Sequence, residues 1–150
     1  MATQADNMII RAQAIKTWDD KQQQGLEVYG RHNERFGGVT GENAIPRIQY
    51  YPITSHVPNG SQGLVLCLGG NPDVAVVVGM EPPDIRPTDL EEGEFKLYDK
   101  WDHYLHGKED EWYVKVGPCE AWLKESGQIR FKCGSAVIEM SEGGVVHLNP

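Results

Sequence analysis

Two histidines in the second half of the chain have neighbours that could do chemistry. His103 and His106 lie close to Glu109 and Asp110, and imidazole with carboxylate is a ligand set that suits zinc or iron. The spacing argues against a metal site, because residues three apart on a strand point to opposite faces and an HxxH pair binds metal best on a helix. We therefore expect both histidines to be surface or turn residues.

Other groups of reactive residues lack the spacing that their chemistry needs. The acidic runs at 19–20 and 89–94 have no calcium-loop pattern, and the glycine-rich segments 37–41 and 69–71 lack the Lys-Ser/Thr ending of a phosphate loop. We expect solvated faces and turns there. Ser55-His56 comes without a nucleophile elbow. The sequence therefore predicts no enzyme, no catalytic residues, no metal and no cofactor.

Composition limits the compartment and the partners. The three cysteines, Cys67, Cys119 and Cys133, are an odd number without CxxC spacing, so we expect small apolar residues in a reducing compartment. The start of the chain lacks the pattern of a signal peptide and no run of about 18 apolar residues occurs, which predicts a soluble chain not secreted by that route. The formal net charge of −8 opposes binding to nucleic acid.

The elements that position these residues are predicted to be all-β. Seventeen glycines and nine prolines are too many for a helical bundle. Within residues 1–80 we expect five strands, at 8–15, 25–29, 47–51, 64–68 and 74–78, which is the size of an OB-fold-like barrel. The last two are continuous apolar runs, expected to be buried on both faces. The predicted barrel core includes Ile10, Leu64, Leu66, Val76 and Val78.

The second part of the chain differs in charge and rhythm. Residues 1–80 carry six basic and seven acidic groups, and residues 81–150 carry eight and fifteen. Three prolines at 82, 83 and 87 predict a stiff linker over residues 81–94. Residues 95–150 contain short alternating segments with a glycine every seven to ten residues. The alternation predicts one apolar face and one charged outer face; the charged candidates are Glu120, Lys124, Arg130, Lys132 and Glu139.

These strands are too short to form a core of their own, so the apolar face needs a cover. Stacked rungs that close against copies in other chains would supply it, and a three-chain β-prism meets the need. Three tryptophans spaced 11 and 10 residues apart are expected to form an aromatic ladder, with a carbohydrate platform as the rival interpretation. The residues predicted to pack in this trimeric shaft are Trp101, Trp112, Trp122, Ile129, Phe131, Val137 and Val145.

Several segments, taken in order, resemble a known family. Residues 51–66 (YPITSHVPNGSQGLVL) are similar to the segment that opens the last barrel hairpin of Mu-like phage baseplate assembly protein V, the central tail spike. The matches continue in the same order over about residues 8–150. They comprise Leu68-Gly69-Gly70-Asn71, Val74 to Val78, Arg86-Pro87-Thr88-Asp89-Leu90, Gly93-Glu94-Phe95 and Leu97-Tyr98-Asp99.

The resemblance implies a homotrimer with an N-terminal OB-fold collar and a C-terminal intertwined β-helix. It implies a place at the centre of a contractile tail baseplate, contact with hub proteins, assembly in the host cytoplasm and penetration of the host outer membrane. Many such spikes hold iron at a tip through HxH motifs, but this sequence has only His147 near its end. A tip iron is therefore not expected. The shaft could end blunt, end in an apolar tip, carry a separate tip protein, or hold a metal at His147 through threefold symmetry.

A second hypothesis is an OB-type binding module with a β-rich appendage, which would hold single-stranded nucleic acid or carbohydrate. Such a face needs lysines and arginines interleaved with aromatic residues on the barrel strands. The basic residues of the first 80 positions are scattered instead. The sequence therefore favours the structural role.

Overall fold

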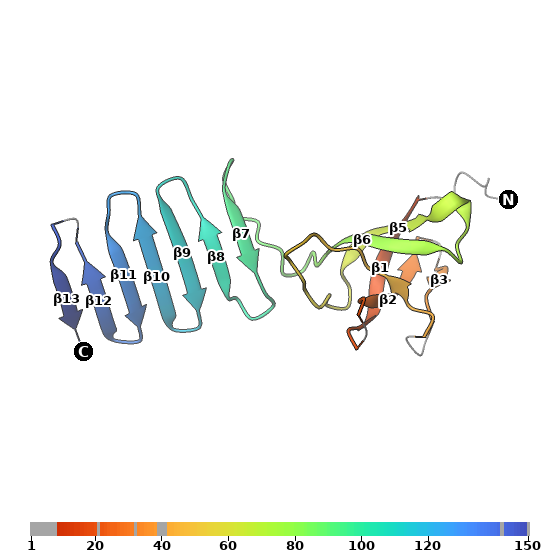
Figure 1. Cartoon of the computed structure of the whole chain (residues 1–150), viewed down its shortest axis with the longest axis horizontal. Coiled ribbons are helices and arrows are strands. Elements are labelled where there is room, and N and C mark those ends of the chain that lie inside the picture. Colours follow the sequence, from red (N-terminus) through yellow and green to blue (C-terminus); the bar gives the residue numbers. More distant parts are fainter. Residues whose placement is uncertain (1–8, 21, 32, 39–41, 142, 150) are drawn as a thin grey trace. The chain divides into compact units, whose positions relative to one another are not determined.

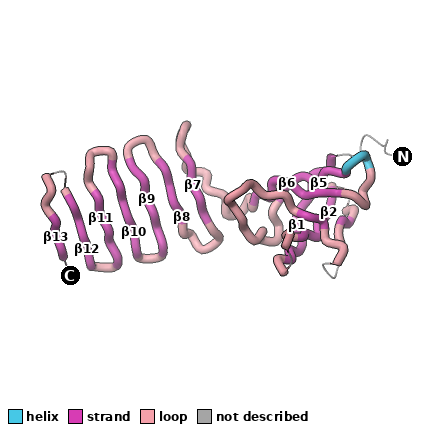
Figure 2. The backbone as a smooth tube through the Cα atoms, in the orientation of Figure 1, coloured by secondary structure: helices cyan, strands magenta, loops and turns pink. Residues whose placement is uncertain are grey.

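The computed structural model describes residues 9–20, 22–31, 33–38, 42–141 and 143–149. The protein is all-β, with two antiparallel sheets (Figure 1). The chain divides into two compact units, Met1–Arg86 and Pro87–Pro150, and the boundary lies inside the Pro-rich segment 81–94. The described residues include one short helical turn, Leu68–Gly70, drawn cyan in Figure 2. Among the described residues, no helix has the length and apolar character needed to cross a membrane.

The first unit, called the barrel unit here, is a twisted sheet that nearly closes on itself. Its strands are β1 (Ile9–Trp18), β2 (Gly25–Gly30), β3 (Arg35–Phe36), β4 (Ile45–Pro46), β5 (Gln62–Cys67) and β6 (Ala75–Glu81). The order is β3-β2-β1-β5-β6, and β4 also pairs with β2. After β4, Arg47 forms a parallel bridge with Val77 of β6, and the Ile48 N–H donates to the Val77 carbonyl at 3.0 Å. Backbone pairing therefore runs around a ring from β1 through β2, β4, β6 and β5.

A strand is predicted over 47–51, but the structure has a shorter strand that begins earlier, β4 at Ile45–Pro46. Beyond the Arg47 bridge the chain leaves the sheet in a loop, and Pro52 has no N–H to donate to a ladder. The Arg47 guanidinium holds the start of this loop, since its Nη1 donates to Gln24 Oε1 at 2.9 Å and to the Ser55 carbonyl at 2.7 Å. Burial lowers the pKa of Arg47.

The core of the barrel unit lies on the opposite face of β5 and β6 from the one predicted. The buried side chains there are Val65, Cys67, Ala75 and Val77, whereas Leu64 is 42% exposed. The other buried apolar residues are Ala12, Ala14, Leu26, Val28, Ile45, Val57 and Met80. Ile10, predicted as a core residue, is partly buried and packs against this core. Burial also raises the pKa of the Cys67 thiol.

Leu64, Leu66, Val76 and Val78 form the outer face of the β5–β6 hairpin, where Leu64 pairs with Val78 and Leu66 with Val76. Leu66, Val76 and Val78 are half-buried, so the two runs are not buried on both faces. The prediction chose the wrong face of β5 and β6 for a physical reason. In a continuous apolar run every residue is a candidate for the core, so the sequence carries no two-residue period that identifies the inner face.

The second unit, called the shaft unit here, is a seven-stranded meander. Its strands are β7 (Phe95–Tyr98), β8 (Tyr104–Gly107), β9 (Glu111–Val116), β10 (Cys119–Lys124), β11 (Ile129–Cys133), β12 (Ala136–Met140) and β13 (Val146–Asn149). Each strand pairs with its neighbours in sequence, and Figure 1 shows them side by side in that order. Turns at Gly117 (φ 56°) and Gly134 (φ 61°) use the left-handed conformation that glycine favours. Strands β9 to β13 correspond to the alternating segments that the sequence predicts at 112–116, 119–124, 128–133, 136–140 and 145–148, and β7 and β8 are additional.

Candidate interaction surface

The strands of the shaft unit alternate between apolar and polar side chains, as the sequence pattern predicts. In β11, Ile129, Phe131 and Cys133 point to one face, and Arg130 and Lys132 point to the other. The charged candidates Glu120, Lys124, Arg130, Lys132 and Glu139 all share one face by strand register. The face that carries them is called the polar sheet face. The opposite one is called the apolar sheet face.

The register arranges the apolar sheet face in three rows that cross the strands. The first row contains large side chains and is called the bulky row; it comprises Phe95, Gly107, Trp112, Leu123, Ile129, Met140 and Val146. The central row comprises Leu97, Leu105, Val114, Ala121, Phe131, Ile138 and Leu148. The third row contains smaller side chains and is called the small row; it comprises Val116, Cys119, Cys133 and Ala136. No charged side chain of the described strand residues lies on this face.

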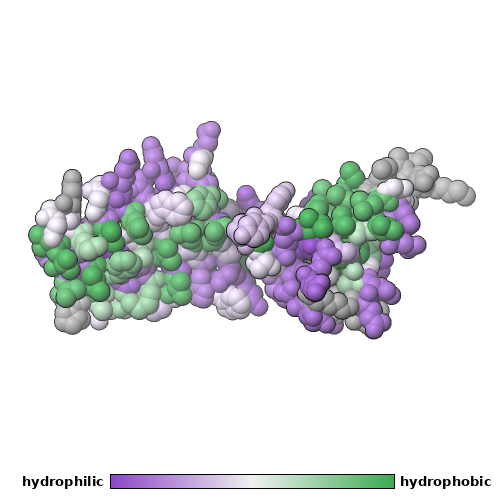
Figure 3. Space-filling view, in the orientation of Figure 1, coloured by the Kyte–Doolittle hydropathy of each residue, from purple (hydrophilic) through white to green (hydrophobic). Residues whose placement is uncertain are grey.

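On this sheet the apolar side chains are more exposed than the residues between them, which is the reverse of the usual pattern in a single folded chain. In β12 the apolar residues Ala136, Ile138 and Met140 are exposed, and the intervening Val137 and Glu139 are half-buried. The exposed fraction reaches 52% at Leu97 and 71% at Leu148. Figure 3 shows apolar atoms as a broad band across the strands of this unit. A continuous apolar surface of this extent marks an interaction surface.

An apolar hollow of about 330 Å³ lies on this face, over the small row. Its floor and walls include Cys119, Ala121, Cys133 and Ala136, with Phe131 and Ile138 alongside. The hollow exists because alanine and cysteine side chains stand beside larger ones. It is therefore a place where a side chain from outside could pack.

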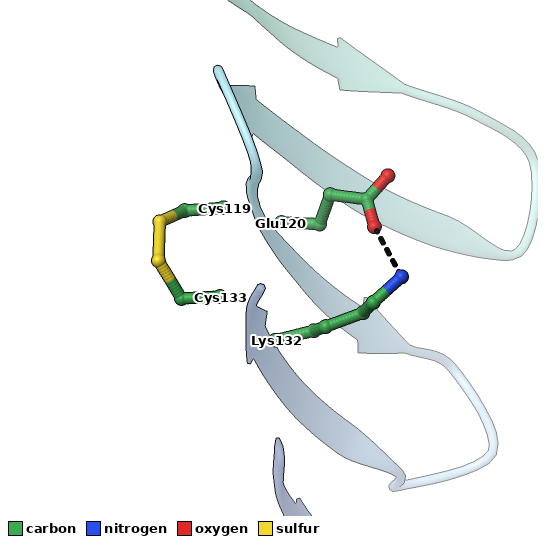
Figure 4. The surroundings of a disulfide bond; sticks show 4 residues. All are labelled: Cys119, Glu120, Lys132 and Cys133. Atoms are coloured by element: carbon green, nitrogen blue, oxygen red, sulfur yellow. Dashed lines mark ion pairs between the residues drawn. A yellow bond between two sulfur atoms is a disulfide. The ribbon is translucent and has the colours of Figure 1, made fainter. Parts of the chain in front are cut away.

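A disulfide joins Cys119 and Cys133 within the small row, which corrects the expectation that all three cysteines are unpaired thiols. The two residues are direct register partners on β10 and β11. Figure 4 shows their sulfur atoms on one side of the hairpin, while the neighbouring Glu120 and Lys132 form an ion pair at 3.6 Å on the other side. Spacing alone did not reveal the pair, because the contact depends on the register of the hairpin. Cys67 is unpaired and buried.

The polar sheet face covers itself with its own long side chains. Lys96 lies 4.7 Å from the ring centre of Tyr104, which contacts Tyr113 edge-on at 5.6 Å. Tyr113 stacks on Trp122 at 5.2 Å, and the Arg130 guanidinium lies 5.4 Å from the Trp122 ring. This ladder crosses β7, β8, β9, β10 and β11. Cation–π and aromatic contacts of this kind stabilise neighbouring strands, so this face needs no partner to become partly buried.

Carboxylates on this face are held in their charged form. The Tyr113 hydroxyl donates to Glu120 at 2.5 Å, which lowers the pKa of Glu120, with a further contribution from Lys132. Burial, together with Glu120, raises the pKa of Tyr113. Glu94 accepts a hydrogen bond from the backbone N–H of Glu91 and contacts His106 Nε2 at 3.0 Å, and both interactions lower its pKa.

His106 is buried at 4% exposure, so the expectation of a surface position was wrong for it. Its partner Glu94 lies just before β7, and β8 turns His106 toward it. His103, in the turn between β7 and β8, pairs with Asp99 at 3.0 Å. These are two separate pairs. Within the described part of the chain, no group of three or more His, Cys, Asp or Glu residues could hold a metal ion.

The predicted shaft-packing residues are divided between surfaces. Trp112, Ile129 and Phe131 lie on the apolar sheet face, whereas Trp122 and Val137 lie on the polar one. Trp101 and Val145 lie in turns and are exposed. His147 pairs with Glu139 in register on the polar sheet face. Whether any of these residues packs in a trimer stays a prediction.

The predicted tryptophan ladder does not form within the chain. Trp112 contacts Phe95 edge-on at 5.2 Å on the apolar sheet face, and Trp122 stacks on Tyr113 on the other. In the β9–β10 hairpin, Trp112 is opposite Leu123, so Trp122 is one position out of line and points the other way. A spacing of about ten residues therefore does not determine the face.

These observations define a class: an all-β protein in which a small barrel precedes a meander with one self-covered polar face and one uncovered apolar face. Residues 11–84 match the model of the family described as Bacteriophage Mu Gp45, N-terminal. The match lies in the barrel unit and supports a Mu-like phage baseplate protein family for this chain. This family suggests a structural role in a phage baseplate and a location in the virion tail. No curated protein matches the chain.

Proposed function

We propose that this chain is the subunit of a homotrimeric central spike of a contractile phage tail baseplate. In this proposal three copies wind their meanders into an intertwined β-helical shaft. Sheath contraction then drives the shaft through the host outer membrane. The role is mechanical, so it requires no catalytic group and no cofactor. The uncovered apolar sheet face of the shaft unit is the observation that carries the proposal.

The size of that face suits association between copies. About ten large apolar side chains are exposed to between a third and three quarters of their surface, which amounts to on the order of 1,000 Å² of apolar surface per copy, compared with about 800 Å² per partner in a standard stable interface. Burial of that surface is favourable at about 25 cal/mol per Å² before association costs are subtracted. A second copy offers the same uncharged surface, so no charge is buried when the faces meet.

In the same proposal, the barrel unit is an OB-fold-type collar that binds hub proteins of the baseplate. The ring of backbone pairing β1-β2-β4-β6-β5 supports this assignment, since an OB-fold is a five-stranded, partly open barrel. The outer face of β5 and β6 is apolar and partly exposed, with Leu64 42% exposed, and this supports a protein partner there. Nucleic acid is not a proposed partner, because the net charge of −8 opposes it.

The mass of the full chain in solution tests the trimer. We expect light scattering on a sizing column to give three times 16.8 kDa at two concentrations a factor of ten apart. A monomer at both concentrations would contradict the proposal, because it would leave the apolar sheet face without a cover.

A matched pair of substitutions tests which face associates. Ile138 and Val137 are adjacent in β12 and point to opposite faces. We expect Ile138→Asp to give a monomer, because the carboxylate would lie in the apolar interface, and Val137→Asp to remain a trimer. The reverse result would show that the copies associate through the polar sheet face.

A further inference from the structure

Side-chain size on the apolar sheet face is graded along the strands. The bulky row lies toward one end of the strands and contains Trp112, Leu123, Ile129 and Met140 on four consecutive strands. The small row lies toward the other end of the same strands, with Val116, Cys119, Cys133 and Ala136. Large side chains therefore project from one edge of the face, and a hollow of about 330 Å³ lies at the other edge.

This shape limits how two copies can meet. If the bulky row of one copy packed on the bulky row of the next, large side chains would collide and both hollows would stay empty. Protein interiors are close-packed, and empty space in an apolar interface costs free energy. A bulky row placed over a small row fills the hollow instead. Both rows are apolar and uncharged, so no polar group loses its partner.

We propose that the bulky row of one copy packs into the hollow above the small row of the next copy. The contact is heterologous: one surface of each copy meets a different surface of its neighbour. Repeated around a threefold axis, it closes into a ring in which each copy uses both rows once. This inference rests on the proposed self-association of the shaft unit and adds the pairing of rows that the association uses.

Leu123 and Ala136 make the pairing testable, because they cannot touch within one chain. Met140 lies in the same row as Leu123, two strands away in the sheet. Ala136 is on the strand of Met140, four positions along it. At about 4.8 Å per strand and 3.3 Å per residue, the separation of Leu123 and Ala136 within the chain is about 16 Å. Substitutions that far apart act additively unless a contact between copies couples them.

The experiment is a double-mutant cycle on the full chain, read by the concentration at which the trimer dissociates. Ala136→Leu fills the hollow and is combined in turn with Trp112→Ala, Leu123→Ala, Ile129→Ala and Met140→Ala. We expect Ala136→Leu alone to raise the dissociation concentration by about tenfold, because the larger side chain overpacks the contact, and a tenfold change corresponds to about 1.4 kcal/mol. At least one truncation should restore most of that loss. Val137→Leu, on the polar sheet face, is the control and should couple with none of them.

The outcomes separate the two proposals. A trimer in which all four combinations are additive would overturn the pairing of rows and leave the trimer standing. A wild-type monomer, or a dimer, would overturn both the proposed function and the pairing. If Ala136→Leu does not fold, as judged by circular dichroism, Ala136→Val enters the same cycle with a smaller expected effect.

Discussion

Glu120 shows how the local geometry of a single residue on the polar sheet face makes the stability of the protein depend on pH. The Tyr113 hydroxyl donates to its carboxylate, and Lys132 and Lys115 lie near enough to favour its charge. The pKa of Glu120 is therefore lower in the folded chain than the value of about 4.3 expected when unfolded. A group of this kind binds fewer protons when folded, so it stabilises the folded state above the unfolded pKa.

We expect the stability contributed by Glu120 to be lost as pH falls from about 4.3 through its lower folded pKa. Glu120→Gln keeps an acceptor for Tyr113 but does not titrate, so its thermal midpoint should fall less between pH 7 and pH 3.5 than that of the wild type. Tryptophan fluorescence on heating measures this, because Trp122 stacks on Tyr113. Glu125→Gln, in the exposed turn after β10, is the control. Equal acid sensitivity of the wild type and Glu120→Gln would contradict the prediction.

Among the elements, the β5–β6 hairpin depends on a close approach at Gly63. The ladder is irregular between Gln62 and Leu64, and a Cβ at Gly63 would come within 2.7 Å of both the Met80 nitrogen and the Val78 oxygen. These are backbone atoms of the paired strand and cannot rotate away. The glycine is therefore required by the shape of the hairpin and not by a turn.

We expect Gly63→Ala to lower the free energy of unfolding by about 2 kcal/mol, within the range measured for overpacked sites. Urea unfolding followed by circular dichroism measures it. Gly143→Ala provides the comparison, because a Cβ there would meet nothing within 4 Å. If both variants unfold at the same urea concentration as the wild type, the hairpin has more room than the structure indicates.

The same elements show what can be predicted from sequence. Alternation such as Ile129-Arg130-Phe131-Lys132 identifies both the strand and its faces, because a charge at every second position excludes one face from the core. In Leu64-Val65-Leu66 no residue is polar, so the strand is predictable and the face is not. Short strands such as β7 and β8 have four residues each and carry too little pattern to identify, so the burial of His106 in β8 is not predictable from sequence. The apolar rows and the disulfide depend on exact register between strands, which spacing alone does not supply.

At the scale of the whole molecule, the uneven charge bears on the proposed assembly. Residues 81–150 carry eight basic and fifteen acidic groups, so copies brought side by side repel one another. Salt screens this repulsion, with a Debye length of about 10 Å at 0.1 M, and leaves apolar contacts intact.

We expect the trimer to associate more tightly in 500 mM NaCl than in 20 mM NaCl. The protein concentration at which it dissociates should therefore be lower at the higher salt concentration. Light scattering on a dilution series at the two salt concentrations measures this. Val137→Asp serves as a control, because it adds charge outside the proposed interface and should increase the salt effect. Weaker association in high salt would indicate that ion pairs hold the copies together and would contradict an interface made by the apolar sheet face.

The meander of the shaft unit also has a consequence for how its length can vary. Every strand of this unit pairs only with the strands next to it in sequence, so the contact order is low and strand pairing requires no long loop to close. Stability in such an array is close to a sum over neighbouring units. A hairpin with matching rows could therefore be added or removed without a new fold, and each would change the length of the sheet by about 10 Å. The number of hairpins therefore sets the length of the shaft unit.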